Sequence, residues 1–428
     1  MTLTNRDAKN IWHPYTQQHK AKPPIPIIRG EGSYLYDEQD RRYIDAVSSW
    51  WVTLHGHSHP FIVDRVVAQL RKLDQVIFAG FTHEPAIELA EKLLEILPAN
   101  QQKVFYTDNG STAVEVALKM CVQYWFNKGL KRNKVITFYN GYHGDTFGAM
   151  SVSGRNPWTA PFDSFLFEVV FIDTPTADNL DILKDQITAH AHDLACFIYE
   201  PLVQGSAGML MYSALALDEL MAHCKSCGVL MIQDEVFTGF GRTGKNFAAD
   251  HLTTKPDLMC FSKGLTGGTM PLGITTCTEQ IHDAFLSEDK LKTLFHGHSF
   301  TANPLACTAA IASIELLVQK ETQQNIKRIC QKHQEFYIRI ANHPKLKDVR
   351  QTGTIIAMEW KTESGTSYFN ELRNQLYEYF LEKGILMRPL GNVIYILPPY
   401  CISDQDLDYI YEQIEESLAV FSTKPVLI

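Results

Sequence analysis

The stretches VLMIQDEVFTGFGRTG, residues 229–244, and CFSKGLTGG, residues 260–268, decide the fold of this chain. The first opens with an apolar run of strand length that ends at Asp234, and the second begins with the last residues of another such run, DLMCFS (257–262), just before Lys263. Short apolar runs bounded by polar and glycine residues are typical of buried strands in a parallel sheet. Ligands of such sheets bind at the carboxyl ends of the strands, so both side chains are candidates for one site.

An aspartate and a lysine in these positions suit pyridoxal 5'-phosphate. That cofactor needs an amine to hold its aldehyde as a Schiff base, and a carboxylate to keep its ring nitrogen protonated. A surface lysine and a capping aspartate are the commoner fates of either residue alone. The prediction that Lys263 and Asp234 are catalytic therefore rests on their combination.

The strand pattern continues on both sides of these stretches. Apolar runs alternate with helical patterns such as residues 111–126 and 214–226, which predicts an α/β fold with helices on both faces of a mostly parallel sheet. The seven expected strands are residues 103–107, 134–139, 167–172, 194–200, 228–233, 257–262 and 272–277.

Two domains are expected, because 428 residues exceed the usual size of one hydrophobic core. Residues 61–320 would form the large domain, ending in a long helix at 303–320. Residues 1–60, with a hairpin-like DEQD turn at 37–40, and residues 321–428 would form a smaller α+β domain. The latter segment shows helical patterns near 368–384 and from about Ser403, with a strand at 392–398.

Composition narrows the class of protein. A net charge of -9 argues against nucleic-acid binding, and no apolar run is long enough to span a bilayer. The first 20 residues lack the apolar core of a secretory signal, so a cytoplasmic location is expected. The nine cysteines are expected to be reduced, and Cys224 and Cys227 lack the partners that a zinc site needs.

Polar residues follow several of the expected strands. Gly110 and Ser111 stand at a helix start, where exposed N–H groups suit a phosphate, although a plain N-cap is equally common. Tyr142 and Asp145 follow another strand and could stack on a flat cofactor and hold a substrate amine. Glu200 ends a third strand, and a buried glutamate favours a site role.

Two further patterns invite other interpretations. GFGRTG, residues 239–244, matches a dinucleotide-binding motif but does not open a helix directly after a strand. We interpret it as a loop over the active site, in which Arg242 could pair with a carboxylate. The histidines of HGHSHP (55–60) and HGHS (296–299) suggest a metal site, yet alternating histidines in a turn rarely give tetrahedral geometry, and no metal is expected.

Aromatic residues gather near the N-terminus. Adjacent residues of a strand face opposite ways, so one of Trp50 and Trp51 is expected to line a pocket or an interface. Arg388 precedes an expected strand, and its planar fork suits a carboxylate substrate.

Together these segments resemble the class III, or ω-, aminotransferases of the fold-type I group, over about residues 11–400. The resemblance is carried by IWHPYT (11–16), SSWWV (48–52), YHGDTFGAMS (142–151), QDEVFTGFGRTG (233–244), KGLTGGTMPL (263–272), NPLAC (303–307) and MRPLGNVIYILPPY (387–400). IWHPYT and the paired tryptophans resemble the biotin-biosynthesis branch. That branch moves an amino group from S-adenosylmethionine to 8-amino-7-oxononanoate in a ping-pong reaction.

The resemblance implies a role for each matching residue. Lys263, Asp234 and Tyr142 would be catalytic, with Tyr142 stacked on the cofactor ring. Cofactor binding would also involve Gly110, Ser111, Glu200 and, from the partner subunit of a homodimer, Ser299. Substrate binding is expected of Tyr15, Trp50, Trp51, Asp145, Arg242, Gly297, Arg388 and Tyr395.

The sequence departs from the family in two places. His298-Ser299 stands where relatives often carry Pro-Thr, and the serine keeps a hydroxyl for the phosphate. Ser206 stands where ornithine-type relatives carry a glutamate, which favours the biotin branch. No residue decides between S-adenosylmethionine and lysine as the amino donor.

Three alternatives stay open. Another class III aminotransferase would act on ornithine, a diamine or a β-amino acid. A nicotinamide oxidoreductase would use the GFGRTG loop and carry no pyridoxal phosphate. A non-catalytic cofactor-binding dimer would have a regulatory role, against which an intact Lys263 and Asp234 weigh.

Overall fold

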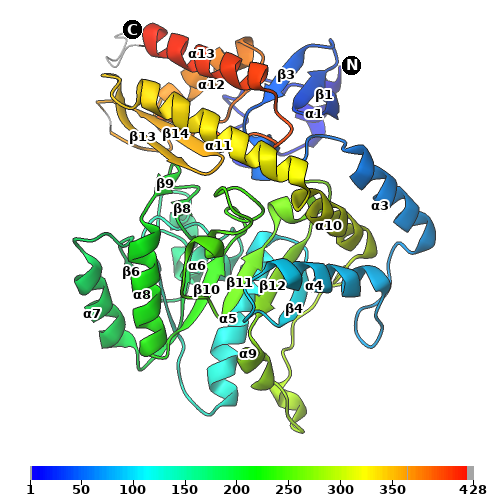
Figure 1. Ribbon diagram of the computed structural model, residues 1–428, viewed down its shortest axis with the longest axis vertical. Helices are drawn as coiled ribbons and strands as arrows, with labels where there is room; N and C mark the ends of the chain where they lie inside the picture. Colours follow the sequence, from blue (N-terminus) through cyan, green and yellow to red (C-terminus); the bar gives the residue numbers. More distant parts are fainter. Residues whose placement is uncertain (1, 364, 422–428) are drawn as a thin grey trace.

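All seven expected strands enter one sheet of the computed structural model, which describes residues 2–363 and 365–421 (Figure 1). Their order is β4-β12-β11-β10-β7-β5-β6, and only β12 runs antiparallel to its neighbours. The predicted fold class is confirmed. The strands are β4 (Lys103–Thr107), β5 (Lys134–Phe138), β6 (Val169–Ile172), β7 (Leu194–Tyr199), β10 (Leu230–Asp234), β11 (Leu258–Phe261) and β12 (Gly273–Cys277).

Every residue of the central strands β7, β10 and β11 is buried, because helices cover both faces of this sheet. Successive side chains alternate between the faces. Cys196 and Ile232 pack with α5 on one face, whereas Phe197 and Met231 pack with α7 and α8 on the other. These helices are α5 (Gly110–Asn127), α7 (Leu180–His190) and α8 (Ala214–Ser226).

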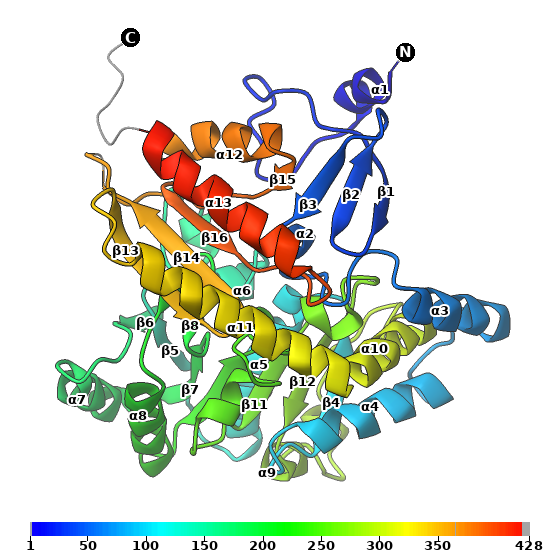
Figure 2. The same ribbon diagram turned by 45° about the horizontal axis from the view of Figure 1, so that its top comes forward.

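Segments from both ends of the chain form a smaller region beside the large sheet (Figure 2). In its four-stranded sheet, β1 (Ile27–Glu31), β2 (Tyr34–Asp37) and β3 (Arg42–Asp45) join β15 (Ile385–Leu386), which pairs in parallel with β3. The DEQD turn links β2 to β3 as an antiparallel hairpin. The proposed domain limits at residues 60 and 320 stay predictions.

A second small sheet and three helices complete this region. β13 (Leu346–Thr352), β14 (Ile355–Trp360) and β16 (Val393–Ile396) are antiparallel. The helix expected at 303–320 is α10 (Pro304–Leu317), and a separate helix, α11 (Lys320–Ile340), follows it. The last two helices are α12 (Leu372–Glu382) and α13 (Asp404–Val420), which Ser403 caps.

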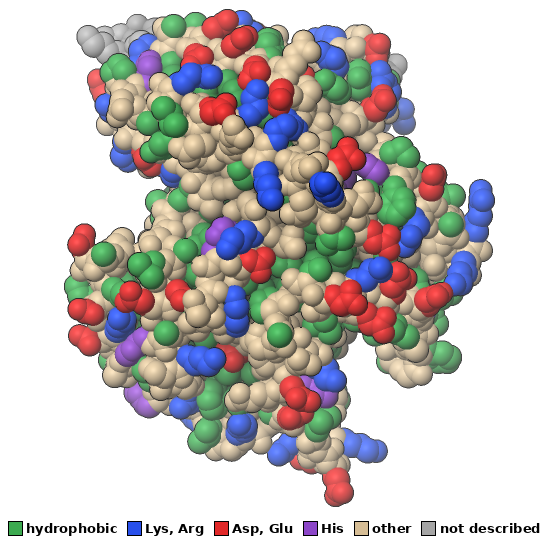
Figure 3. All heavy atoms as spheres, viewed as in Figure 1, with side chains coloured by type: hydrophobic (Ala, Val, Ile, Leu, Met, Phe, Trp, Pro, Cys, Tyr) green, Lys and Arg blue, Asp and Glu red, His purple; other side chains and the backbone are tan. Residues whose placement is uncertain are grey.

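Further helices, turns and a hairpin complete the structure. They are α1 (Leu3–Asn10), α2 (Ser48–Trp51), α3 (Pro60–Lys72), α4 (Glu84–Ile96), α6 (Phe147–Ser151), α9 (Glu279–Asp283), the 3₁₀ turns Ala160–Phe165, Ala248–His251, Lys263–Thr266 and Lys290–Lys292, and the β8–β9 hairpin (Val203–Gln204 and Leu210–Met211). None of the helices in the described part of the chain is both long and apolar enough to cross a membrane. Acidic and basic side chains intermingle over the face shown in Figure 3.

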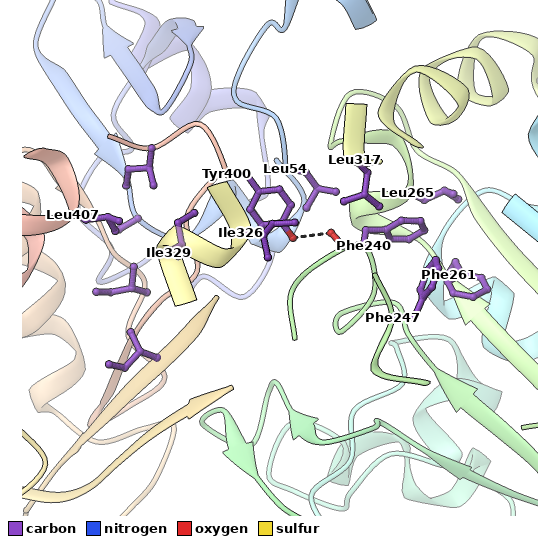
Figure 4. Packing of buried hydrophobic residues seen from close by; sticks show 14 of the residues in the cluster. Leu54, Phe240, Phe247, Phe261, Leu265, Leu317, Ile326, Ile329, Tyr400 and Leu407 are labelled. Atoms are coloured by element: carbon purple, nitrogen blue, oxygen red, sulfur yellow. Dashed lines mark hydrogen bonds between the residues drawn. The ribbon is translucent and has the colours of Figure 1, made fainter. Parts of the chain in front are cut away.

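One hydrophobic core joins the two regions (Figure 4). Tyr400, from the loop after β16, packs beside Leu54 and Ile326, and its hydroxyl donates to the carbonyl of Phe240 at 2.7 Å. Tyr400 is 2% exposed. The buried carbonyl has no access to water, so this hydrogen bond is needed to satisfy it.

Replacing Tyr400 with Phe should lower the free energy of unfolding by roughly 1–3 kcal/mol, because it leaves that carbonyl unpaired. Tyr139, whose side chain is 50% exposed, is the matched control, and Tyr139→Phe should change stability by less than about 0.5 kcal/mol. Denaturant unfolding of both variants measures the difference. Equal free energies of unfolding for the two variants would contradict the role given to the hydrogen bond from Tyr400 to Phe240.

Candidate active site

The carboxyl ends of four parallel strands bring the expected catalytic residues to one edge of the sheet. Gln233 lies opposite Tyr199 in β7, and Asp234 at the end of β10 lies opposite Cys260 in β11. Glu200 directly follows β7, and Lys263 stands two residues after the end of β11. The loop after β5 adds Tyr142.

Asp234 has a buried partner that sequence reasoning missed. His143 Nδ1 lies 2.7 Å from Asp234 Oδ2, and both residues are only 4% exposed. The N–H of Val236 donates to Asp234 Oδ1 at 3.0 Å. The carboxylate is thus held rigidly while keeping acceptor capacity for a further N–H donor. The one available signal was the position of His143 directly after Tyr142.

Lys263 lies at the start of a 3₁₀ turn with a φ of 48°. Its Nζ lies 4.8 Å from the ring centroid of Trp51 and 5.6 Å from that of Phe237. Burial lowers the pKa of Lys263 to about 8, although the charges of Asp234 and Glu200 oppose the shift. Roughly a tenth of this amine is therefore neutral, and reactive, at pH 7, far more than of an ordinary lysine.

Glu200 ties two loops of the site together. It is 5% exposed, and its two carboxylate oxygens accept from the N–H groups of Tyr142 at 2.9 Å and Gly205 at 3.0 Å. Burial raises the pKa of Glu200 to about 7, with the charge of His143 acting against the rise. Within the described residues its side chain fixes the Tyr142 loop through backbone contacts.

The start of α5 forms a cup for an anion. The first two N–H groups of this 18-residue helix, those of Gly110 and Ser111, donate to no acceptor among the described residues. Gly144 closes the cup at a φ of 132°, where a Cβ atom would lie 2.1 Å from Ser111 Oγ. Unpaired N–H groups at a helix start attract phosphate.

Trp51 forms the wall beside Lys263. It is 6% exposed, its ring meets Phe237 edge-on at 4.7 Å, and its indole N–H donates to the hydroxyl of Tyr395 at 2.8 Å. The paired tryptophans belong to the irregular helix α2, not to a strand. Trp51 is buried, whereas Trp50 is 40% exposed, and the expectation that one of the pair lines a pocket or an interface stays a prediction.

Further expected substrate residues gather around Trp50. The guanidinium of Arg388 lies 4.3 Å from the Trp50 ring centroid, and Tyr15 meets the same ring edge-on at 5.7 Å. The Tyr15 hydroxyl donates to Asp145 at 2.5 Å. Arg388 forms no ion pair with any described residue, so its charge is free for an anionic ligand.

Other expected residues lie apart from this group. Arg242 is 1% exposed and donates to the carbonyls of Pro398 and Thr53 at 3.0 and 3.5 Å, rather than to a carboxylate of the described chain. Gly297 and Ser299 lie on an exposed segment, where the Ser299 carbonyl accepts from Gln75 at 2.6 Å. Their roles in binding stay predictions.

The histidines of the two His-rich motifs have other contacts. His55 Nε2 lies 3.1 Å from Ser313 Oγ, His57 Nε2 lies 2.8 Å from Asp45, and His296 Nδ1 lies 3.2 Å from Lys119 Nζ. Across residues 2–363 and 365–421, no three His, Cys, Asp or Glu side chains come together in a way that could hold a metal ion.

Comparisons with known proteins agree with this geometry. A family model described as aminotransferase class-III matches residues 15–418. Curated relatives named adenosylmethionine-8-amino-7-oxononanoate aminotransferase are 44% identical in Synechococcus elongatus, covering 96% of this chain and 98% of the relative, and 37% identical in Staphylococcus aureus, covering 95% and 94%.

Solved structures give the same result. The enzyme of that name from Methanocaldococcus jannaschii has a TM-score of 0.92 at 38% identity, covering 97% of this chain and 98% of that one. The omega transaminase from Pseudomonas jessenii in complex with PMP has a TM-score of 0.91 at 27% identity, covering 98% of both chains.

The lowered pKa of Lys263 predicts a distinctive pH profile for its reactivity. In cofactor-free protein, acylation of Lys263 should rise about tenfold per pH unit and level off above about pH 8, because only the neutral amine reacts. Exposed lysines should continue to gain reactivity toward about pH 10.4. Trace labelling with acetic anhydride, read peptide by peptide by mass spectrometry, measures both. A Lys263 profile that follows the exposed lysines would refute the assignment.

Proposed function

The chain belongs to the class III aminotransferase family, and on that premise we propose that it moves an amino group from S-adenosylmethionine to 8-amino-7-oxononanoate. The product would be 7,8-diaminononanoate, in biotin biosynthesis. The observation that carries the choice of acceptor is Arg388, a guanidinium without an anionic partner in the described chain, packed on Trp50. An acceptor with a terminal carboxylate complements it.

The cofactor is pyridoxal 5'-phosphate, and the residues present fit it. The free N–H groups of Gly110 and Ser111 suit its phosphate, Asp234 suits its ring nitrogen, and Lys263 suits its aldehyde. When bound, it supplies an electron sink that stabilises negative charge on the substrate carbon next to nitrogen.

The chain's own residues supply the proton chemistry. Lys263, with its lowered pKa, would take up a proton at Nζ from the amine-bearing carbon of the donor and would later release it from the same Nζ. Asp234, held by His143, would face the ring nitrogen of the cofactor and stabilise its positive charge. Trp51 and Phe237 place apolar ring surface beside the amine.

Several finer features are part of the same proposal. The enzyme would be a cytoplasmic homodimer in which Ser299 of each subunit contacts the phosphate in the other. The exposed position of the Gly297–Ser299 segment supports this arrangement. Arg242 would support the substrate pocket from within the core, since it is fully surrounded by protein.

The donor and the acceptor can be assigned in one spectroscopic experiment. The purified enzyme should lose its cofactor absorption band with S-adenosylmethionine, but not with ornithine, and 8-amino-7-oxononanoate should restore it. If the band is lost with lysine instead of S-adenosylmethionine and 8-amino-7-oxononanoate restores it, lysine is the donor and the proposed acceptor stands. Conversion by ornithine without restoration by the oxononanoate would refute the proposed function and favour another class III activity.

Replacing Arg388 with Ala should raise the KM for 8-amino-7-oxononanoate by roughly 30- to 100-fold, the effect of losing a charge-assisted hydrogen bond. The turnover number at saturation should change little, since Arg388 does not contact Lys263. Arg388→Lys keeps the positive charge but loses the planar guanidinium with its paired N–H donors, so an intermediate KM is expected. Steady-state kinetics of both variants provide the check, and an unchanged KM in Arg388→Ala would place the acceptor elsewhere.

A further inference from the structure

The segment that carries the paired tryptophans holds a conformation that residues other than glycine rarely adopt. Ser48, Ser49 and Trp51 have φ angles of 50°, 60° and 67°, and Ser49 combines its φ with a ψ of -93°. Each positive φ in a residue with a Cβ is a source of strain. Such a run persists only where surrounding contacts fix it.

Asp45, at the end of β3, provides those contacts. Its Oδ1 accepts from the N–H groups of Val47 at 3.2 Å and Ser49 at 2.9 Å, and its Oδ2 accepts from the same Ser49 N–H at 2.7 Å. His57 Nε2 lies 2.8 Å from Oδ2. Asp45 is 0% exposed, so these charge-assisted contacts are shielded from water.

The two tryptophans depend on this anchor to different degrees. Trp51 has a second anchor, the hydrogen bond from its indole to Tyr395. The indole of Trp50 has no hydrogen bond to any described residue, and its ring meets Tyr15 and Arg388. The position of Trp50 is therefore set mainly by the backbone at Ser49, which Asp45 holds.

We propose that Asp45 is a positioning residue for acceptor recognition, acting through Ser49 to place the Trp50 ring under the Arg388 guanidinium. Asp45 itself lies in the core behind the segment. The inference rests on the proposed function in one respect, namely that Trp50 and Arg388 meet the acceptor. On this proposal, the strained segment from Ser48 to Trp51 helps to determine which acceptor the pocket binds.

The first test replaces Asp45 with Asn in the holoenzyme. The KM for 8-amino-7-oxononanoate should rise by about tenfold, because a small misplacement of a binding group is costly. The turnover number should stay within about threefold, since the hydrogen bond from Trp51 to Tyr395 still holds the wall beside Lys263.

Asp37 offers a matched control in the same sheet. It is also 0% exposed, and it accepts from the N–H groups of Gln39 and Arg41, both at 3.0 Å, in the β2–β3 turn. Asp37→Asn should lower the melting temperature comparably while changing the acceptor KM by less than about twofold. Equal KM values in the Asp45 and Asp37 variants would overturn the proposal.

A fluorescence measurement separates this inference from the proposed function. The contribution of Trp50 is the difference between each protein and its Trp50→Phe counterpart. In Asp45→Asn this difference should show greater quenching by acrylamide than in the wild type, whatever the substrate. If the quenching of the Trp50 contribution is the same in Asp45→Asn as in the wild type, the proposal is overturned. If that quenching increases but the enzyme is inactive with the oxononanoate, only the proposed function is refuted.

A milder variant covers the case in which Asp45→Asn does not fold. His57→Gln keeps the carboxylate and alters only its 2.8 Å contact with the imidazole. It should raise both the acceptor KM and the quenching of Trp50 in the same direction, with KM up by about threefold. No change in either quantity would count against Asp45 as a positioning residue.

Discussion

The 2.7 Å contact between His143 and Asp234 is the interaction on which the rest of the site depends. A buried carboxylate is costly unless it is paired and hydrogen-bonded. This contact, with the N–H of Val236, gives the carboxylate of Asp234 hydrogen-bond partners at the end of β10. Its charge in turn opposes the effect of burial on Lys263. The result is an amine that can exchange protons near neutral pH, beside a carboxylate that stabilises positive charge on the cofactor.

The parallel sheet makes this arrangement possible because it aligns the ends of β5, β7, β10 and β11 at one edge. The smaller region then closes the site with Trp51, Tyr395 and Arg388. Segments from both ends of the chain are needed, since β3 leads into the tryptophans and β15 leads toward Arg388 while the two strands pair with each other. The core around Tyr400 joins this region to the GFGRTG loop.

Much of this could be predicted from sequence. The strand runs were readable because central strands are buried on both faces, and Asp234 and Lys263 stand where such runs end. The His143 contact joins residues 91 positions apart and leaves no local pattern. The positive φ angles at Ser48 and Ser49 could not be predicted either, because serine gives no signal for them. Arg242 was expected to pair with a carboxylate, yet its two terminal nitrogens donate to backbone carbonyls instead.

The most direct test of the central claim is to reduce the holoenzyme with borohydride and locate the cofactor by peptide mass spectrometry. The reduction fixes the pyridoxyl group on whichever lysine holds it. We predict a single modified peptide, carrying the group on Lys263. Modification at another lysine, or none in protein saturated with pyridoxal phosphate, would contradict the account of this site.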